Sequence, residues 1–141
     1  MSELSVLIEI DGGSRGNPGP AAAGVVIKDA ADGQVLFAGG FYIGRATNNV
    51  AEYAGLIRGL AKAAQLQARN VAVRSDSQLM VFQMNGLYRV KNQGLRPLYE
   101  QARQLARQFA QFTIDHVPRE ENEMADRLVN QALDLKQDVE E

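Results

Sequence analysis

Residues 8–20 read Ile8-Glu9-Ile10-Asp11-Gly12-Gly13-Ser14-Arg15-Gly16-Asn17-Pro18-Gly19-Pro20. The stretch continues an alternation of apolar and polar residues, which predicts a strand over residues 4–11 that ends at Asp11. The glycine-rich part predicts a turn, because Gly, Asn and Pro each favour turn conformations. It differs from a P-loop, since no Gly-Lys-Ser/Thr follows and the next element is a strand. One carboxylate therefore stands at a strand end, beside a backbone that a ligand can approach closely.

Apolar runs and turn signals define the remaining elements. The first three predicted strands are joined by short turns, which predicts an antiparallel meander, and the later alternation of strands and helices predicts crossovers. We therefore expect an α/β fold in the order β-β-β-α-β-α-α-β-α, with one mixed sheet and helices on its faces. The expected strands after the first are 22–28, 35–43, 71–75 and 112–117, and the expected helices are 47–67, 77–84, 95–110 and 122–135.

The composition is that of an ordinary globular domain. The chain has 141 residues, 45% of them hydrophobic and 23% charged, which is a common size and composition for one domain. It has no cysteine, which excludes disulfides and thiolate metal sites and fits a reducing compartment. We expect one domain over residues 1–135 and an acidic, frayed tail over 136–141. No signal peptide or membrane-spanning run is recognisable, so we expect a cytoplasmic protein without membrane contact.

The distribution of charge is more informative than its sum. The formal net charge of -2 alone does not indicate a nucleic-acid-binding protein. From Arg58 to Arg107, however, nine residues are Lys or Arg and only two are acidic. This bias suits contact with a phosphate backbone, although ordinary solvated helices give the same pattern. Carboxylates that bind a metal would also lower the formal charge, because the bound cation is not counted.

Four acids are the candidate metal ligands. Asp11 and Asp76 each end a predicted strand, and they lie side by side if those strands are parallel neighbours, because ligands collect at the carboxyl ends of parallel strands. Glu52 and Asp126 stand near the starts of predicted helices. An all-oxygen ligand set suits Mg²⁺ or Mn²⁺ rather than zinc. Each acid also has a structural alternative, such as a capping box formed by Asn49 and Glu52, an N-cap at Asp76, or plain exposure.

Four segments together resemble type 1 ribonuclease H, in the order and at the spacing usual in that family. They are Asp11-Gly12-Gly13-Ser14-Arg15-Gly16-Asn17-Pro18-Gly19-Pro20, Thr47-Asn48-Asn49-Val50-Ala51-Glu52, Ser75-Asp76-Ser77-Gln78, and His116-Val117-Pro118-Arg119-Glu120-Glu121-Asn122-Glu123-Met124-Ala125-Asp126. The resemblance extends over roughly Val6 to Leu133. It implies a mixed five-stranded sheet with helices on both faces. It also implies endonucleolytic cutting of the RNA strand of an RNA–DNA hybrid, which leaves 5′-phosphate and 3′-hydroxyl ends.

The resemblance also implies roles for the four acids. Asp11 bridges two Mg²⁺ ions, for which Mn²⁺ is a possible substitute. Glu52 and Asp76 hold one of these ions, and Asp126 helps to hold the ion that activates water. Two cations can stabilise both the attacking and the leaving oxygen of an in-line displacement, so no covalent intermediate is needed.

Substrate contacts are implied in the same way. Amide side chains match positions that contact the minor groove of the hybrid, where a 2′-hydroxyl distinguishes RNA from DNA. Thr47 matches a position that holds a DNA phosphate. Helix capping is the alternative for Thr47, Asn48 and Asn49. The implied partner is an RNA–DNA hybrid, with no obligate protein partner, and we expect a monomer. The four amide residues are Asn17, Asn48, Asn49 and Gln78.

The chain departs from the family pattern in two places. Many relatives carry a histidine in the loop before the last acid, whereas here His116 falls on the last predicted strand, as a core or sheet-edge residue. In the family this histidine is implied to help the product leave. Arg119 or a glutamate of the loop is the candidate for that role, and a solvated loop cation is the alternative for Arg119. The inserted basic helix of some relatives is also missing, so residues 86–91 either follow the DNA strand or pack on the body. Competing functions are a nuclease for double-stranded RNA or DNA and a catalytically silent hybrid-binding module.

Overall fold

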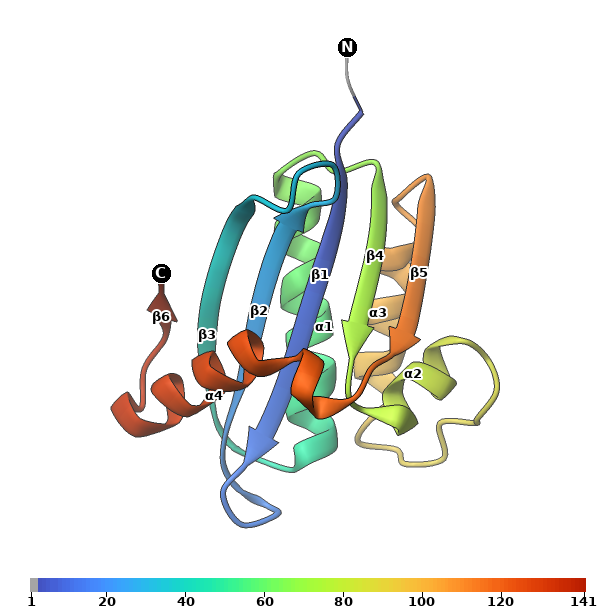
Figure 1. Ribbon diagram of the computed structural model, residues 1–141. Coiled ribbons are helices and arrows are strands. Elements are labelled where there is room, and N and C mark those ends of the chain that lie inside the picture. The colour runs from blue at the N-terminus through green and yellow to red at the C-terminus, as the bar shows by residue number, and fades with distance from the viewer. Residues whose placement is uncertain (1–2) are drawn as a thin grey trace.

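One mixed sheet with helices on both faces forms the body of the protein in the computed structural model, which describes residues 3–141 (Figure 1). The element order along the chain agrees with the prediction through the last helix. The strands are β1 (Ser5–Ser14), β2 (Gly19–Asp29), β3 (Val35–Ala46), β4 (Asn70–Ser75), β5 (Gln111–His116) and β6 (Val139–Glu140). The helices are α1 (Asn48–Gln65), α2 (Gln78–Met84), α3 (Arg96–Ala106) and α4 (Glu123–Leu135), with a 3-10 turn η1 at Arg119–Glu121.

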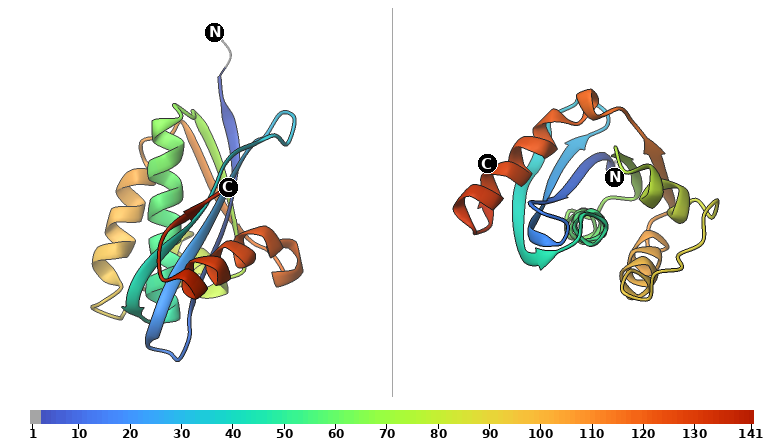
Figure 2. Two further views of the ribbon diagram at one scale, coloured as in Figure 1. Left: turned by 90° about the vertical axis from the view of Figure 1, so that its left-hand side faces the viewer. Right: turned by 90° about the horizontal axis from the view of Figure 1, so that it is seen from below.

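The sheet combines an antiparallel half and a parallel half. Its strand order is β5-β4-β1-β2-β3-β6. β1, β2 and β3 form the predicted antiparallel meander, whereas β4 pairs parallel with both β1 and β5. The helices α1 and α3 cover one face and α4 crosses the other (Figure 2). None of the helices within residues 3–141 has the length and apolarity that a membrane crossing needs.

Two glycines in α1 let this helix lie close against β1. A Cβ on Gly55 would lie 2.6 Å from the side chain of Ile10, and one on Gly59 would lie 3.1 Å from that of Ile8. Glycine in a helix costs about 1 kcal/mol relative to alanine. The close contact with fully buried strand residues explains why glycine stands at these positions.

Two strand glycines on the opposite face let α4 lie close against the sheet. Gly24 of β2 and Gly40 of β3 are register partners. A Cβ on Gly24 would lie 2.1 Å from the carbonyl oxygen of Ala125, and one on Gly40 would lie 2.5 Å from that of Leu128. The backbone of α4 therefore rests directly on the sheet, which fixes the position of its first turn.

The first strand is longer than predicted. β1 does not end at Asp11 but continues through Gly12 and Gly13 to Ser14, because these residues pair with residues 21–23 of β2. The glycine-rich turn is correspondingly shorter and lies between Ser14 and Gly19. Asp11 is thus held on both sides by regular backbone rather than placed at the start of a loop.

The end of the chain also differs from the prediction, and the sheet has six strands rather than five. The segment expected to be frayed contains β6, whose residues pair with Gly39 and Gly40 of β3. Two of its three acids have partners: Glu141 forms an ion pair with Arg127 at 2.8 Å, and Asp138 accepts a hydrogen bond from the backbone N–H of Tyr42 at 2.8 Å. An acidic composition predicted disorder, but these contacts hold the segment against β3 and α4.

Candidate metal centre and nucleic-acid interface

The first two acids lie side by side because of the register between β1 and β4. The parallel pairing of these strands ends at Ile10 and Ser75. Asp11 follows Ile10 and Asp76 follows Ser75, so the two acids lie side by side where β4 ends. Asp11 is nearly buried, with 6% of its surface exposed, and Asp76 is half-buried.

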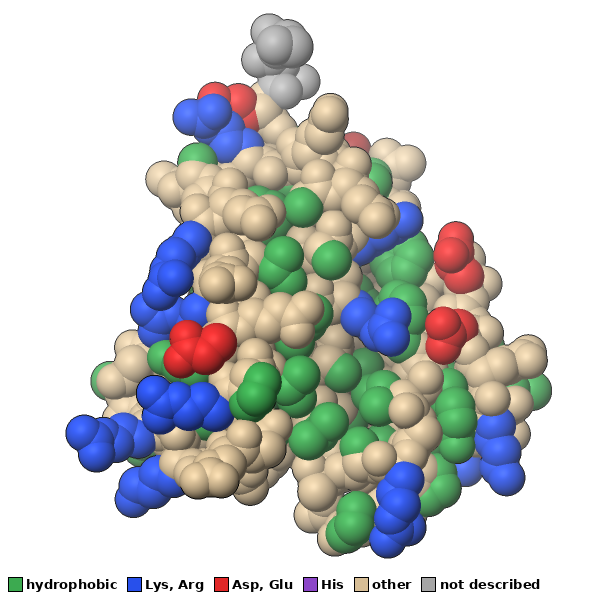
Figure 3. All heavy atoms as spheres, turned by 180° about the vertical axis from the view of Figure 1, so that it is seen from behind, with side chains coloured by type: hydrophobic (Ala, Val, Ile, Leu, Met, Phe, Trp, Pro, Cys, Tyr) green, Lys and Arg blue, Asp and Glu red, His purple; other side chains and the backbone are tan. Residues whose placement is uncertain are grey.

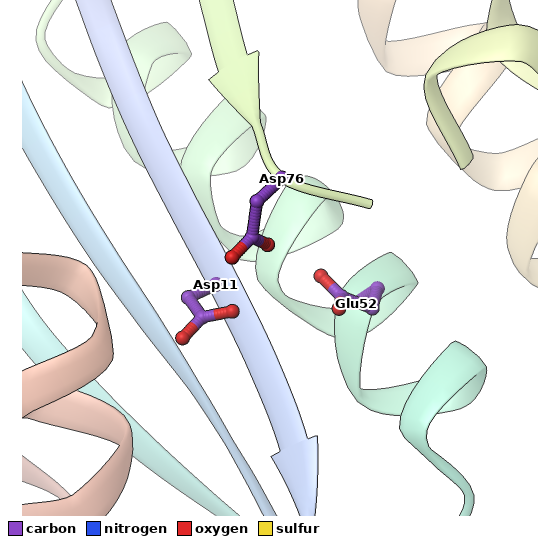
Figure 4. A group of neighbouring side chains, drawn as sticks. All are labelled: Asp11, Glu52 and Asp76. Carbon is purple, nitrogen blue, oxygen red and sulfur yellow. The ribbon is translucent and has the colours of Figure 1, made fainter. Parts of the chain in front are cut away.

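The third acid, Glu52, approaches from the helix on the other face. Side chains alternate along a strand, so Gly12 faces α1 while Asp11 faces the opposite side. A Cβ on Gly12 would lie 2.5 Å from the backbone nitrogen of Glu52, which means that α1 touches β1 at this residue. One carboxylate oxygen from each of Asp11, Glu52 and Asp76 lies within 4.8 Å of the others. Figure 4 shows the three carboxylates turned toward one another from β1, α1 and the end of β4.

The fourth acid, Asp126, lies in the first turn of α4. Gly24, the register partner of Asp11, is the residue on which this turn rests. Asp126 lines the same cavity of about 660 Å³ as Asp11, Glu52 and Asp76. All four acids separated in the sequence therefore meet at one cavity, with Asp126 on the α4 side of Asp11.

The carboxylates repel one another, and burial strengthens this repulsion. Burial, the charge of Asp76 and the hydrogen bond and charge of Asp126 raise the pKa of Asp11 to about 8. Burial, followed by the charges of Asp11 and Asp76, raises the pKa of Glu52 well above its usual value, while the charge of Arg119 opposes this shift. Such pKa shifts are typical of sites where a positive charge is expected to bind.

A divalent cation fits this donor set. The Oε2 atom of Glu52 is buried and has no hydrogen-bond partner within residues 3–141, so its lone pairs are free to bind a ligand. The remaining donors are also carboxylate oxygens, which hard cations such as Mg²⁺ and Mn²⁺ prefer.

The structure excludes helix capping by two of the acids. Thr47 is the N-cap of α1 and its hydroxyl accepts a hydrogen bond from the N–H of Val50 at 3.2 Å. The capping box between Asn49 and Glu52 is therefore not formed. Ser77 is the N-cap of α2 and its hydroxyl accepts from the N–H of Met80 at 3.3 Å, so Asp76 is not the cap.

The predicted substrate residues divide into two groups. Asn17 and Asn48 connect the β1–β2 turn to the start of α1: Asn17 Oδ1 accepts from the N–H of Asn48 at 3.0 Å, and Asn48 Oδ1 accepts from the N–H of Ser14 at 2.8 Å. Asn49 and Gln78 are exposed in the first turns of α1 and α2. Of the predicted substrate residues, Asn48 lines the cavity of the acids, and the others lie outside its lining.

Comparison with known proteins identifies the family. The sequence model of the family described as "Reverse transcriptase-like" matches residues 9–132. The crystal structure of RNase H1 from Halobacterium salinarum is 46% identical, with a TM-score of 0.89, over 92% of this chain and 98% of that chain. The chain belongs to the type 1 ribonuclease H family. LC11-RNase H1, solved in complex with an RNA/DNA hybrid, is 42% identical with a TM-score of 0.88, over 93% of this chain and 98% of that one.

A ribonuclease H domain can also be part of a longer protein. A "Bifunctional protein" from Mycobacterium tuberculosis is 53% identical over 131 residues, which are 93% of this chain but 36% of that protein. The chain thus spans about a third of the length of this curated relative.

His116 lines the cavity of the acids, a position that its local sequence pattern did not predict. It ends β5 at the sheet edge, as one of the two predicted alternatives, but it is exposed rather than part of the core. Its register partner is Ser75, the residue before Asp76, and it lines the cavity together with the four acids and Arg119. The signal that was available is its position: it ends a strand that is parallel to β4, so it emerges at the same edge as Asp76.

The segment between α2 and α3 is partly a packed loop and partly an exposed one. Tyr88 packs edge-on against Phe82, with ring centroids 5.1 Å apart, yet 49% of its surface is exposed. Leu87 is 68% exposed, and Arg89 and Lys91 are exposed as well. The packing alternative thus holds for one edge of Tyr88, whereas contact of this loop with a DNA strand stays a prediction.

Proposed function

We propose that this protein is an Mg²⁺-dependent endoribonuclease that hydrolyses the RNA strand of RNA–DNA hybrids and leaves 5′-phosphate and 3′-hydroxyl ends. The observation that carries the proposal is the convergence of Asp11, Glu52 and Asp76 within 4.8 Å, with one oxygen of Glu52 buried and unpaired. Family membership supports it, as does the RNA/DNA hybrid in the complex of LC11-RNase H1.

The acids would serve as the ligands of two cations. Asp11 would be a ligand of both ions, Glu52 and Asp76 would hold one of them, and Asp126 would help to hold the other. When bound, the ions stabilise the attacking and the leaving oxygen of an in-line displacement. The protein contributes a rigid support, since Asp11 is in the middle of β1 and Glu52 is fixed by the contact of α1 with Gly12.

Two further side chains at the cavity assist the reaction. An imidazole can give and take a proton near neutral pH, and His116 lies exposed at the rim with the acids. We assign to His116 proton transfer to the leaving oxygen, because it lines the cavity beside the acids. Arg119 lies close enough to Glu52 for its charge to lower the pKa of that carboxyl, and it is suited to hold a phosphate of the substrate.

The substrate lies across the cavity and the adjoining basic surface. Asn48, Asn49 and Gln78 at the starts of α1 and α2 present amides that can both donate to and accept from the minor groove. Lys and Arg side chains gather on the side of α3 and of the loop before it (Figure 3). Because such contacts neutralise phosphates and release counterions, binding weakens steeply with salt. The exposed basic residues of this region are Arg89, Lys91, Arg96 and Arg107.

A substrate panel tests the proposal. Purified protein is incubated with labelled RNA–DNA hybrid, double-stranded RNA and duplex DNA, each with Mg²⁺, with Mn²⁺ or with EDTA. We expect cutting of the RNA strand of the hybrid only, and none in EDTA. Equal cutting of duplex DNA would overturn the substrate assignment, and hybrid binding without cutting in either metal would favour a catalytically silent module.

A further inference from the structure

Asn122 is a buried polar residue outside the set of metal ligands. It lies between η1 and α4, and 1% of its surface is exposed. Its Nδ2 donates a hydrogen bond to the backbone carbonyl of Ile10 at 2.6 Å. Its Oδ1 has no hydrogen-bond partner within residues 3–141. The bond to Ile10 therefore fixes the orientation of the amide.

Asn122 is hydrogen-bonded to the backbone next to Asp11 and to the backbone of Asp126. Its side chain donates a hydrogen bond to the backbone carbonyl of Ile10, the residue directly before Asp11. Its backbone carbonyl accepts a hydrogen bond from the N–H of Asp126 at 3.1 Å. Two hydrogen bonds through one residue thus connect the backbone beside Asp11 to the backbone of Asp126, although the two acids lie on different elements and far apart in the sequence.

Asparagine at this position carries an unfavourable contribution, because its Oδ1 is buried without a partner within residues 3–141. A buried polar atom without a partner is unfavourable, and an apolar side chain of similar size would avoid that loss. What an apolar side chain cannot supply is a directed bond to the Ile10 carbonyl at the rung where the β1–β4 ladder ends. An unpaired polar group that is retained next to a cluster of acids is best explained by a need for exact placement of those acids.

We propose that Asn122 is a positioning residue, which fixes the separation of Asp11 and Asp126 and thereby sets the affinity of the cation that these two acids share. It touches neither the cation nor the substrate, and it acts through the two backbone segments that carry the ligands. The inference rests on the proposed metal centre and adds to it a residue that holds the centre in shape.

Asn85 offers a matched control. Its Nδ2 also donates to a strand carbonyl, that of Ile114 on β5, at 3.0 Å. The variants N122S and N85S each remove one bond of this kind, but only N122S loosens the connection between Asp11 and Asp126. D126N serves as the reference for loss of a ligand. N122L keeps a similar side-chain volume, removes the donor and adds no charge, so it replaces N122S if the smaller residue prevents folding.

The experiment measures Mg²⁺ binding by calorimetry without nucleic acid, and then kcat and KM for hybrid cutting. Loss of a group that orients a metal ligand weakens metal binding or activity by about 10- to 100-fold. We expect N122S to bind Mg²⁺ about tenfold more weakly and to lower kcat at limiting Mg²⁺, while KM for the hybrid stays within about twofold. N85S should bind Mg²⁺ as the unaltered protein does.

Equal Mg²⁺ affinity of N122S and N85S would overturn the proposal, even if both variants melt at lower temperature. That result would make Asn122 a purely structural residue. Because the comparison is made by calorimetry, it stays decisive if the unaltered protein binds Mg²⁺ but cuts no hybrid. In that case the proposed function fails, and the role of Asn122 is judged separately.

Discussion

Gly12 of β1 and Glu52 of α1 touch through their backbones, and a Cβ on residue 12 would lie 2.5 Å from the nitrogen of Glu52. This contact brings a helix on one face of the sheet to a carboxylate on the other. Asp11 and Gly12 are successive strand residues, so they face opposite sides of the sheet. Asp11 supplies one metal ligand, and Gly12 leaves room for α1, which supplies Glu52 as another. The metal centre therefore depends on a residue that has no side chain.

The variant G12A tests this dependence. Its methyl group would overlap backbone atoms of α1 at Ala51 and Glu52. The whole helix therefore has to shift, and Glu52 shifts with it. We expect a loss of about 2 kcal/mol in the free energy of unfolding and a fall of tenfold or more in kcat. Urea denaturation and steady-state kinetics measure both. G13A is the stability control, since its Cβ would meet the side chain of Val129 at an ordinary 3.6 Å. Equal stability of the two variants would contradict the account.

Removing one acid should stabilise the protein when no metal is present. The pKa of Asp11 is raised from 3.8 to about 8 in the folded protein, so folding favours its protonated form. The corresponding stability is present below pH 3.8 and is lost as the pH rises through about 8. In EDTA at pH 8.5, D11N should therefore melt at least about 3 °C above the unaltered protein, which corresponds to about 1 kcal/mol for a domain of this size. A lower melting temperature of D11N under these conditions would count against charge repulsion at the centre.

The same pKa shifts predict how pH changes the metal requirement. Protons compete with the cation for Asp11 and Glu52, whose pKa values are both raised. The Mg²⁺ concentration for half-maximal cutting should fall as the pH rises from about 6.5 to about 8.5, by up to about tenfold per pH unit for each proton released. Cutting rates over a grid of pH and Mg²⁺ concentrations measure this dependence. A half-maximal concentration that stays constant over this range would show that the acids bind metal without losing protons.

The sequence predicted most elements because their apolar periodicity is strong, but it misplaced two features for physical reasons. Gly12 and Gly13 resemble a turn by composition, yet pairing with β2 continues the strand through them. The acidic tail forms β6 because of partners that lie on distant elements. The pattern placed His116 at a sheet edge, but a local pattern does not show that this strand end lies beside Asp76.

Substitutions of His116 and Arg119 separate two roles at the cavity. We expect H116A to lower kcat by about 100-fold or more, because proton transfer by a positioned side chain contributes about 10²- to 10⁴-fold. We expect R119A to lower turnover by several-fold while hybrid binding is kept. Both are measured by kcat and by hybrid affinity in Ca²⁺ or EDTA. Unchanged steady-state kinetics of either variant would remove the role assigned to that residue.

The most direct test of the metal centre is a crystal soaked in Mn²⁺ and measured for anomalous scattering. We predict two ions, each within about 2.5 Å of carboxylate oxygens, one between Asp11, Glu52 and Asp76 and the other between Asp11 and Asp126. The D11N variant treated in the same way should lose both. Mn²⁺ bound elsewhere on the protein, with no ion at Asp11, would contradict the account.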